Sequence, residues 1–217
     1  MQLKENGQKN LRQNRKNKRF IYLISPNKIK NEEFYTKLNQ VLSSKKVSFF
    51  QLRLKKESLE KKIYIGKKIK KICKKYQVKF LINDDPIIAR KVNADGCHLG
   101  QKDMNILNAR KILKNKIIGI TCHNSINLAK KAISSGANYL AFGAFYSSKT
   151  KKVKYKASLK ILSLAKKLTN TPIVAIGGIK DVNYKKLLLN KANFLAISSY
   201  IWNNKKLNPK EAINKLI

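Results

Sequence analysis

The sequence predicts a single α/β domain with the (β/α)8 architecture of a TIM barrel. Short apolar runs of strand length alternate with longer amphipathic runs, and eight such units fit into the 217 residues. This alternation indicates a parallel sheet covered by helices, and eight units are the number that closes a TIM barrel. An open doubly wound sheet is the alternative. Its glycine-rich first turn is missing, because residues 25–27 read Ser-Pro-Asn.

Each expected strand is a short run rich in apolar and β-branched residues. The eight runs are Phe20–Ser25, Val47–Leu54, Val78–Asn83, Gly96–Leu99, Ile117–Thr121, Tyr139–Phe142, Ile173–Ile176 and Phe194–Ser198. Helical periodicity is clearest in four segments. These are Leu59–Tyr76, Ser125–Ser134, Ser158–Leu168 and Val182–Leu189. Local signals support the boundaries: Asp85 before Pro86 predicts a helix N-cap, and Ser135-Gly136 predicts a helix end.

The composition indicates a folded globular protein with a large excess of positive charge. Hydrophobic residues make up 43% of the chain, and no apolar run reaches the ~18 residues of a membrane span. The 49 Lys and Arg outnumber the 11 Asp and Glu, which gives a net charge of +38. Such a charge attracts anionic partners, including nucleic acid. The cations are spread over the whole chain, so small phosphorylated substrates are favoured over nucleic acid, and no membrane partner is expected.

Residues 1–18 are polar and basic and show no hydrophobic periodicity, so they are expected to form a flexible tail before a barrel domain of residues 19–217. Cys73, Cys97 and Cys122 are an odd number of widely spaced cysteines. This pattern is typical of reduced thiols, and it predicts a cytoplasmic protein. The number of subunits is left open, and a homo-oligomer is compatible with the sequence.

The acidic residues concentrate in one window, Leu81–Met104, which holds Asp84, Asp85, Asp95 and Asp103. Asp84 follows the third expected strand and Asp103 lies in the loop after the fourth. The loops after neighbouring parallel strands meet at the same end of a barrel, so these two carboxylates are predicted to share a Mg²⁺ ion. Asp85 is assigned to the helix cap, and Asp95 is assigned to a turn before the fourth strand.

The end of the second expected strand predicts an anion-binding site. Gln51, Arg53 and Lys55 share one face of an extended chain, and they would point into the mouth of the barrel. Leu52 and Leu54 would point outward to the helices. A run of surface charge is the alternative interpretation. It is less favoured because the polar residues occupy only alternate positions.

The ends of the seventh and eighth strands predict a second anion-binding site, apart from the one made near the metal by strands two to six. Residues 143–152, after the sixth strand, contain hydroxyls followed by Lys, a composition that suits a phosphate or pyrophosphate as well as a solvated loop. Gly177-Gly178 and Ser198-Ser199 follow the seventh and eighth strands. Loops at these two positions are where TIM barrels commonly bind phosphate.

Together these motifs resemble the thiamine-phosphate synthase family over nearly all of residues 20–200. The matching segments are Gln51-Leu52-Arg53-Leu54-Lys55, Ile82-Asn83-Asp84, Ala94–Asp103, Gly119-Ile120-Thr121, Ser148-Lys149-Thr150-Lys151 and Ala175–Ile179. No single motif is specific, but their order and spacing through a barrel of this length are.

The resemblance implies a transferase. It would join 4-amino-2-methyl-5-hydroxymethylpyrimidine pyrophosphate to a thiazole phosphate, releasing thiamine phosphate and pyrophosphate. The positions implied for the pyrimidine pyrophosphate are Gln51, Leu52, Arg53, Leu54, Lys55, Asn83, Thr121 and Lys151. Those implied for the thiazole phosphate are Ser148, Lys149, Thr150, Gly178, Ser198 and Ser199. Asp84 and Asp103 match the Mg²⁺ ligands. Arg53, Lys55 and Lys151 would be the catalytic cations that neutralise the departing pyrophosphate.

The chain departs from the family pattern in two places. Ser148 stands where Thr is usual, while Ser147 and Ala144 replace prolines in the same loop. Phe194 occupies a position that is commonly Gly, which bears on the geometry of the second phosphate site.

Two alternative functions remain at this point. A thiazole tautomerase of the same family would use His123 as an acid–base, but it has no need of the predicted metal–pyrophosphate site. A basic nucleic-acid-binding barrel is the alternative from another class, and the net charge motivates it.

Overall fold

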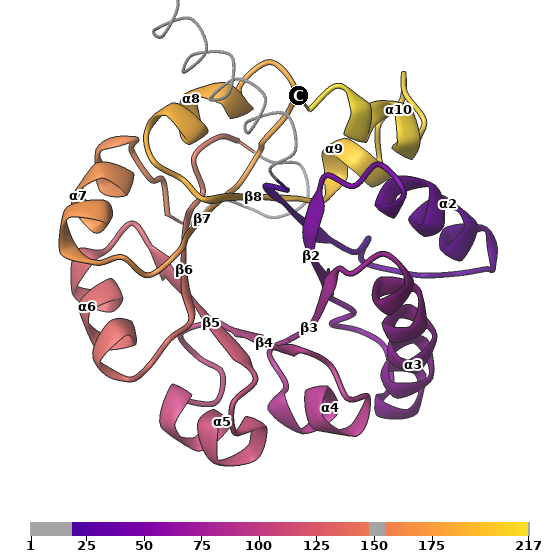
Figure 1. The fold of residues 1–217 in the computed structure, drawn as a ribbon, viewed down its shortest axis with the longest axis horizontal. Helices are drawn as coiled ribbons and strands as arrows, with labels where there is room; N and C mark the ends of the chain where they lie inside the picture. Colours follow the sequence, from indigo (N-terminus) through magenta and orange to yellow (C-terminus); the bar gives the residue numbers. More distant parts are fainter. Residues whose placement is uncertain (1–18, 148–154, 217) are drawn as a thin grey trace, which may run out of the picture.

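Eight parallel strands form a closed barrel, with the helices around its outside (Figure 1). The structure, a computed structural model, describes residues 19–147 and 155–216. Strands pair in chain order, and the first strand closes the ring by pairing with the last. The predicted (β/α)8 barrel is therefore confirmed. The predicted tail, residues 1–18, lies outside the described residues and stays a prediction.

The strands correspond closely to the predicted apolar runs. They are β1 (Ile21–Ile24), β2 (Val47–Leu52), β3 (Lys79–Asn83), β4 (Gly96–Leu99), β5 (Ile117–His123), β6 (Tyr139–Gly143), β7 (Ile173–Ile176) and β8 (Phe194–Ile197). β2 ends at Leu52, earlier than predicted. The reason is that the Arg53 amide donates to the hydroxyl of Ser25 and does not continue the ladder of strand hydrogen bonds.

The helices shield the outer face of the barrel. They are α2 (Glu33–Leu42), α3 (Leu59–Lys75), α4 (Pro86–Lys91), α5 (Ile106–Leu113), α6 (Ile126–Ser134), α7 (Lys160–Leu168), α8 (Tyr184–Leu189), α9 (Ser199–Trp202) and α10 (Pro209–Asn214). α3, α6, α7 and α8 confirm the four predicted helical segments. α2 lies outside those segments, yet it buries Phe34, Leu38 and Val41 on one face. Packing of such a face, more than intrinsic propensity, stabilises a short helix.

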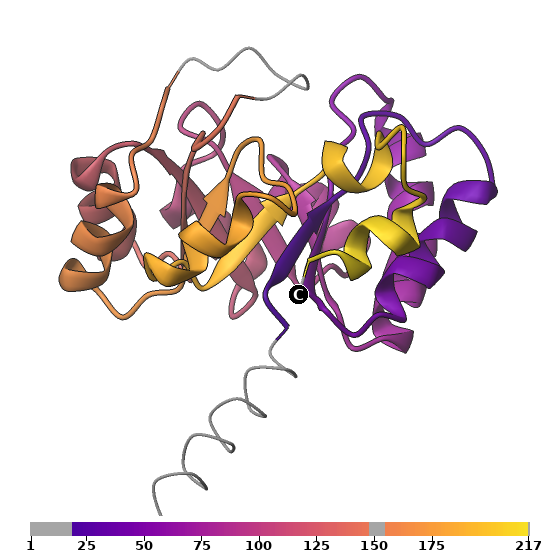
Figure 2. The same cartoon turned by 90° about the horizontal axis from the view of Figure 1, so that it is seen from above.

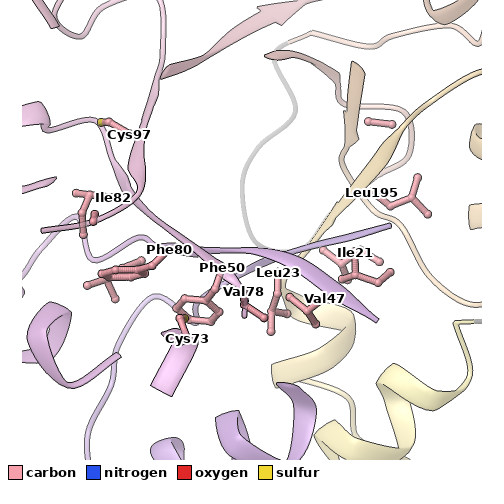
Figure 3. Close-up of a cluster of buried hydrophobic side chains, with 14 of the residues drawn as sticks. Ile21, Leu23, Val47, Phe50, Cys73, Val78, Phe80, Ile82, Cys97 and Leu195 are labelled. Carbon is pink, nitrogen blue, oxygen red and sulfur yellow. The ribbon is translucent and has the colours of Figure 1, made fainter. Parts of the chain in front are cut away.

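The barrel wall separates two apolar clusters. The larger cluster fills the layer between strands and helices, and Figure 3 shows part of it, with Phe50, Phe80 and Ile82 on the outer face of their strands. The smaller cluster fills the inside of the barrel and contains Tyr22 and Tyr139. Alternate residues along a strand face these two regions, so seven of the strands contribute to both, whereas the apolar side chains of β4 lie in the larger cluster.

Seen from the side, the helices surround the barrel wall, and α9 and α10 follow β8 and lie beside α2 (Figures 1 and 2). The indole nitrogen of Trp202 in α9 donates to the carbonyl oxygen of Ile24, which attaches α9 to the end of β1. Across the described residues, no helix has the length and apolar character that crossing a membrane requires.

Candidate active site at the carboxyl ends of the strands

A pair of amides links the carboxyl ends of β2 and β3. The Gln51 side chain is 2% exposed, and its Nε2 donates to Oδ1 of Asn83 at 2.9 Å. This bond occupies the Asn83 oxygen and leaves the Asn83 amide nitrogen available to donate elsewhere. A buried polar side chain is costly without such a partner. Gln51 therefore has a structural reason to be buried, since it orients Asn83 at the end of β3.

Arg53 is positioned by the end of β1. Its backbone amide donates to Oγ of Ser25 at 2.9 Å, and its guanidinium donates to Oδ1 of Asn27 at 3.1 Å. Leu52 and Leu54 are buried in the outer cluster, as the alternation predicts. The polar residues Gln51 and Arg53 are thus held at the barrel mouth by contacts that do not involve the helices.

Lys55, Asp84 and Asp103 form a charged group at the ends of β2, β3 and β4. The ammonium of Lys55 lies 3.2 Å from Oδ2 of Asp84. Asp103 accepts a hydrogen bond of 2.7 Å from the Gly100 amide, and its carboxyl lies within hydrogen-bonding reach of Asp84. Burial raises the pKa of Asp103 above its usual range, and the neighbouring Asp84 raises it further, although the Gly100 amide and Lys55 oppose the shift.

The donor chemistry of this pair of carboxylates fits a Mg²⁺ ion. Burial is the main cause of the raised pKa of Asp103, and Lys55 is the cation that opposes it. Within the described residues, no group of three or more His, Cys, Asp or Glu is arranged to hold a metal. Mg²⁺ is commonly bound through one or two carboxylates together with phosphate oxygens and water. Asp84 and Asp103 are the residues that would hold it.

The other two acids of the window have structural roles. Oδ1 of Asp85 accepts from the amides of Ile87 and Ile88 at 2.8 and 2.9 Å, which makes Asp85 the N-cap of α4. Oδ2 of Asp95 accepts from the ammonium of Lys70 at 2.7 Å and from the amide of Phe80 at 2.8 Å. Both roles agree with the predicted division of the acids.

A chain of hydrogen bonds runs through the interior of the barrel to Thr121. The hydroxyls of Tyr22 and Tyr139 are 2.7 Å apart, and the Tyr139 hydroxyl is 2.8 Å from Nδ1 of His98. Nε2 of His98 is 2.8 Å from Oγ1 of Thr121. Burial lowers the pKa of His98 to about 4, with Asp103 opposing and Arg53 adding to the shift, so the ring is neutral at neutral pH.

The ends of β7 and β8 bring Gly178 and Ser198 to the same level of the barrel. Ile176 pairs with Ala196, so each of the two residues lies two positions beyond a paired strand residue. Gly178 has a φ of +62°, and a Cβ there would lie 2.3 Å from the carbonyl oxygen of Ser147. A side chain is therefore excluded, because Tyr146 and Ser147 pack closely against Gly178. Ser198 donates through Oγ to the carbonyl oxygen of Ser25 at 3.1 Å.

Comparison with known proteins identifies the family. A family model described as thiamine monophosphate synthase matches residues 21–201. The chain belongs to the thiamine monophosphate synthase family. It is therefore an enzyme of the transferase class, like the relatives that follow.

Members of the family resemble this chain over most of its length. A thiamine-phosphate synthase from Pelagibacter ubique is 73% identical over 206 residues, which are 95% of this chain and 100% of the relative. One from Nitrosomonas eutropha is 37% identical and covers 84% of this chain and 86% of the relative. The solved thiamine phosphate pyrophosphorylase from Pyrococcus furiosus has a TM-score of 0.80 at 28% identity and covers 92% of this chain and 94% of its own.

One departure from the family pattern has a simple structural account. Phe194 begins β8, pairs with Val174 and packs edge-on against Phe49 with ring centroids 5.0 Å apart. It belongs to the apolar cluster inside the barrel, at the amino end of the strand. Ser198 follows the other end of β8, so Phe194 does not border it along the chain.

Part of the predicted family site cannot be placed. Ser148, Lys149, Thr150 and Lys151 lie outside the described residues, so their proposed phosphate contacts stay predictions. His123, the candidate acid–base of a tautomerase, lies at the end of β5 with its ring stacked 4.2 Å from the ring of Tyr155.

Sequence reasoning assigned no role to several residues that shape this end of the family barrel. Ser25 joins the ends of β1, β2 and β8, and its only sequence signal was the Ser-Pro-Asn turn. His98 and Tyr139 lie in apolar strand segments, where the sequence pattern indicates only core packing. Alternation along β4 could have shown that His98 faces inward, but it could not reveal the hydroxyl groups on either side of it.

Proposed function

We propose that this enzyme condenses 4-amino-2-methyl-5-hydroxymethylpyrimidine pyrophosphate with a thiazole phosphate to give thiamine phosphate and pyrophosphate. The observation that carries the proposal is the convergence of Lys55, Asn83, Asp84 and Asp103 at the ends of three adjacent strands. Donors, a cation and a carboxylate pair at one place suit a substrate with a pyrophosphate and a hydrogen-bonding ring. The family assignment supports the same reaction.

The residues of the chain would act by binding and by electrostatic stabilisation. The C–O bond between the pyrimidine methylene and the pyrophosphate breaks, the thiazole nitrogen forms the new C–N bond, and pyrophosphate leaves. Arg53 and Lys55 lie where they can neutralise the leaving group, and Asn83 can donate to the substrate because Gln51 occupies its oxygen. When bound at Asp84 and Asp103, Mg²⁺ would supply additional positive charge for the leaving group.

The thiazole phosphate is assigned to the ends of β7 and β8. Gly178 lies there in a conformation with positive φ that suits glycine, and Ser198 with Ser199 begins the short helix α9. Lys151, Ser148, Lys149 and Thr150 complete the proposed sites on the strength of their sequence alone. We place the enzyme in the cytoplasm, because the buried cysteines Cys73, Cys97 and Cys122 are free thiols.

The decisive experiment supplies the purified full-length protein with both substrates, with Mg²⁺ or with a chelator, and measures thiamine phosphate and pyrophosphate. We expect equimolar formation of the two products that depends on Mg²⁺. Formation of no thiamine phosphate in either condition would contradict the proposal. Product formed equally well with the chelator would contradict the metal assignment alone.

The same assay separates the two alternatives. A tautomerase would change the thiazole substrate without consuming the pyrimidine pyrophosphate. A nucleic-acid-binding barrel would form no product and would show salt-sensitive binding to oligonucleotides.

A further inference from the structure

Four side chains form a continuous line of hydrogen bonds from the inside of the barrel to its mouth. Tyr22 and Tyr139 are each 2% exposed, whereas Thr121 at the other end of the line is partly exposed. The three bonds measure 2.7, 2.8 and 2.8 Å along the order Tyr22, Tyr139, His98, Thr121. The line therefore connects buried phenols with Thr121, which the family resemblance assigns to the pyrimidine pyrophosphate of the proposed function.

β5 lies between the strands of His98 and Tyr139, and a glycine in β5 allows the two side chains to come into contact. Gly119 of β5 pairs with His98 on one side and with Tyr139 on the other. A Cβ at Gly119 would lie 1.8 Å from the Tyr139 ring, so only glycine lets that ring cross the β5 backbone. The His98 and Tyr139 rings then stack with an interplanar angle of 14°. This close fit makes the contact a specific feature of the barrel interior.

Counting protons fixes the direction of these hydrogen bonds. The two phenols carry two protons, and two bonds are available to them, one between the phenols and one to Nδ1 of His98. Among the described residues, neither hydroxyl has another hydrogen-bond partner. If Nδ1 carried a proton it would fill the second bond, and one phenolic proton would remain buried without an acceptor, which is unfavourable. The doubly protonated His98 ring also carries a proton on Nδ1, so the same count of protons excludes it.

We propose that His98 is a positioning residue that, through its Nε2–H tautomer, holds the Thr121 hydroxyl as a donor to the pyrimidine pyrophosphate. Nε2 donates to Oγ1 of Thr121, so the hydroxyl proton of Thr121 is free to point into the mouth of the barrel. At the mouth of the barrel, the Thr121 hydroxyl can donate this proton to an acceptor atom of the substrate. The identity of the substrate that accepts from Thr121 rests on the proposed function. The tautomer of His98 rests only on the hydrogen bonds inside the barrel.

The tautomer can be measured on the ligand-free protein. The chain has two histidines, so ¹⁵N-histidine labelling and long-range ¹H–¹⁵N NMR give two ring patterns, and a His123→Asn variant assigns them. Asn tolerates the φ of +52° at position 123. We expect His98 to show a bare Nδ1 and a protonated Nε2 at neutral pH. A protonated Nδ1, in either the neutral or the charged ring, would overturn the proposal.

Two matched variants separate positioning from simple packing. Tyr22→Phe and Tyr139→Phe each remove one buried phenolic oxygen, but only Tyr139→Phe removes the donor to His98. We expect Tyr139→Phe to mix the His98 tautomers and to lower kcat/KM for the pyrimidine pyrophosphate about tenfold, the size of one misdirected hydrogen bond. Tyr22→Phe should keep the tautomer and stay within about twofold of the wild type. Equal losses in both variants would mean a merely structural role.

A second pair of variants covers the case in which Tyr139→Phe does not fold. Thr121→Ser keeps the hydroxyl, and Thr121→Val keeps the shape without it. We expect Thr121→Val to lose about tenfold in kcat/KM for the pyrimidine pyrophosphate and Thr121→Ser to retain most of it. Equal losses would overturn the donor role. If the wild type formed no thiamine phosphate, the proposed function would fail, and the tautomer measurement would still stand as a separate test.

Discussion

The fourth strand has an aspartate near each end, and the two are held in opposite ways. At the amino end, burial raises the pKa of Asp95, but hydrogen bonds from Lys70 and the Phe80 amide outweigh it and lower the pKa below its usual value. Beyond the carboxyl end, burial and the neighbouring Asp84 raise the pKa of Asp103. Asp95 is thus compensated by the protein itself. Asp103, with Asp84, belongs to the pair that we propose binds Mg²⁺, and the nearby protein cation is Lys55.

This comparison separates a stabilising carboxylate from the pair that we propose binds Mg²⁺. Asp95 joins α3, through Lys70, to the start of β3, through Phe80. These hydrogen bonds are made within the chain and need no bound ligand or ion. Asp84 and Asp103 lie close together at the other end, beside Lys55, and we propose that they bind a cation from outside the chain. In TIM barrels generally, the amino ends of the strands contribute to stability and the carboxyl ends carry the active site, and the proposed roles of these acids follow that rule.

The largest effect is expected from removing charge at the carboxyl end. Asp84→Asn should lower kcat by about 100-fold or more, because an electrostatic group at the leaving pyrophosphate is lost. Asn accepts the φ of +66° at this position, so the backbone should be unaffected. The control is Asp85→Asn, which removes the same charge one residue away and retains an N-cap side chain. Steady-state kinetics with saturating Mg²⁺ compares the two, and equal losses would contradict the division of roles.

A smaller effect, of a different kind, is expected at the amino end. Asp95→Ala should lower the free energy of unfolding by about 2 kcal/mol, because the Phe80 amide loses its partner and Lys70 its counter-ion. Turnover per folded molecule should stay close to that of the wild type. Denaturant unfolding and active-site titration measure the two quantities separately. A large loss of kcat with unchanged stability would show that Asp95 belongs to the active site.

The smallest effect concerns acid stability. The pKa of Asp95 is lowered in the folded state, so its contribution is fully present above the unfolded value of ~4 and is lost as the pH falls through the folded value. The unfolding free energy of Asp95→Asn should consequently fall less steeply below pH ~4 than that of the wild type. Denaturant unfolding at a series of acidic pH values tests this. Parallel curves for the two proteins would show that the ion pair with Lys70 adds nothing to stability.

Local sequence signals were sufficient to identify Asp85 and Asp95 as the structural acids of the Leu81–Met104 window. Asp85 was recognisable as a cap because Pro86 follows it, and the turn before β4 identified Asp95 as structural. Asp84 and Asp103 stood out because each follows the end of a strand. The partner of Asp95 was not predictable, since Lys70 lies in α3 among many similar lysines and only the docking of that helix selects it.

The sequence by itself determined the order of the eight strands, their inward and outward faces, and the loops that follow their carboxyl ends. Those properties follow from local periodicity and from the rule that parallel strands align their carboxyl ends. The tertiary structure alone decided which side chains meet across strands. Gln51 orients Asn83, Lys55 reaches Asp84, and the line from Tyr22 to Thr121 crosses Gly119. Such contacts depend on register and shear in the closed barrel, and no local pattern in the chain encodes them.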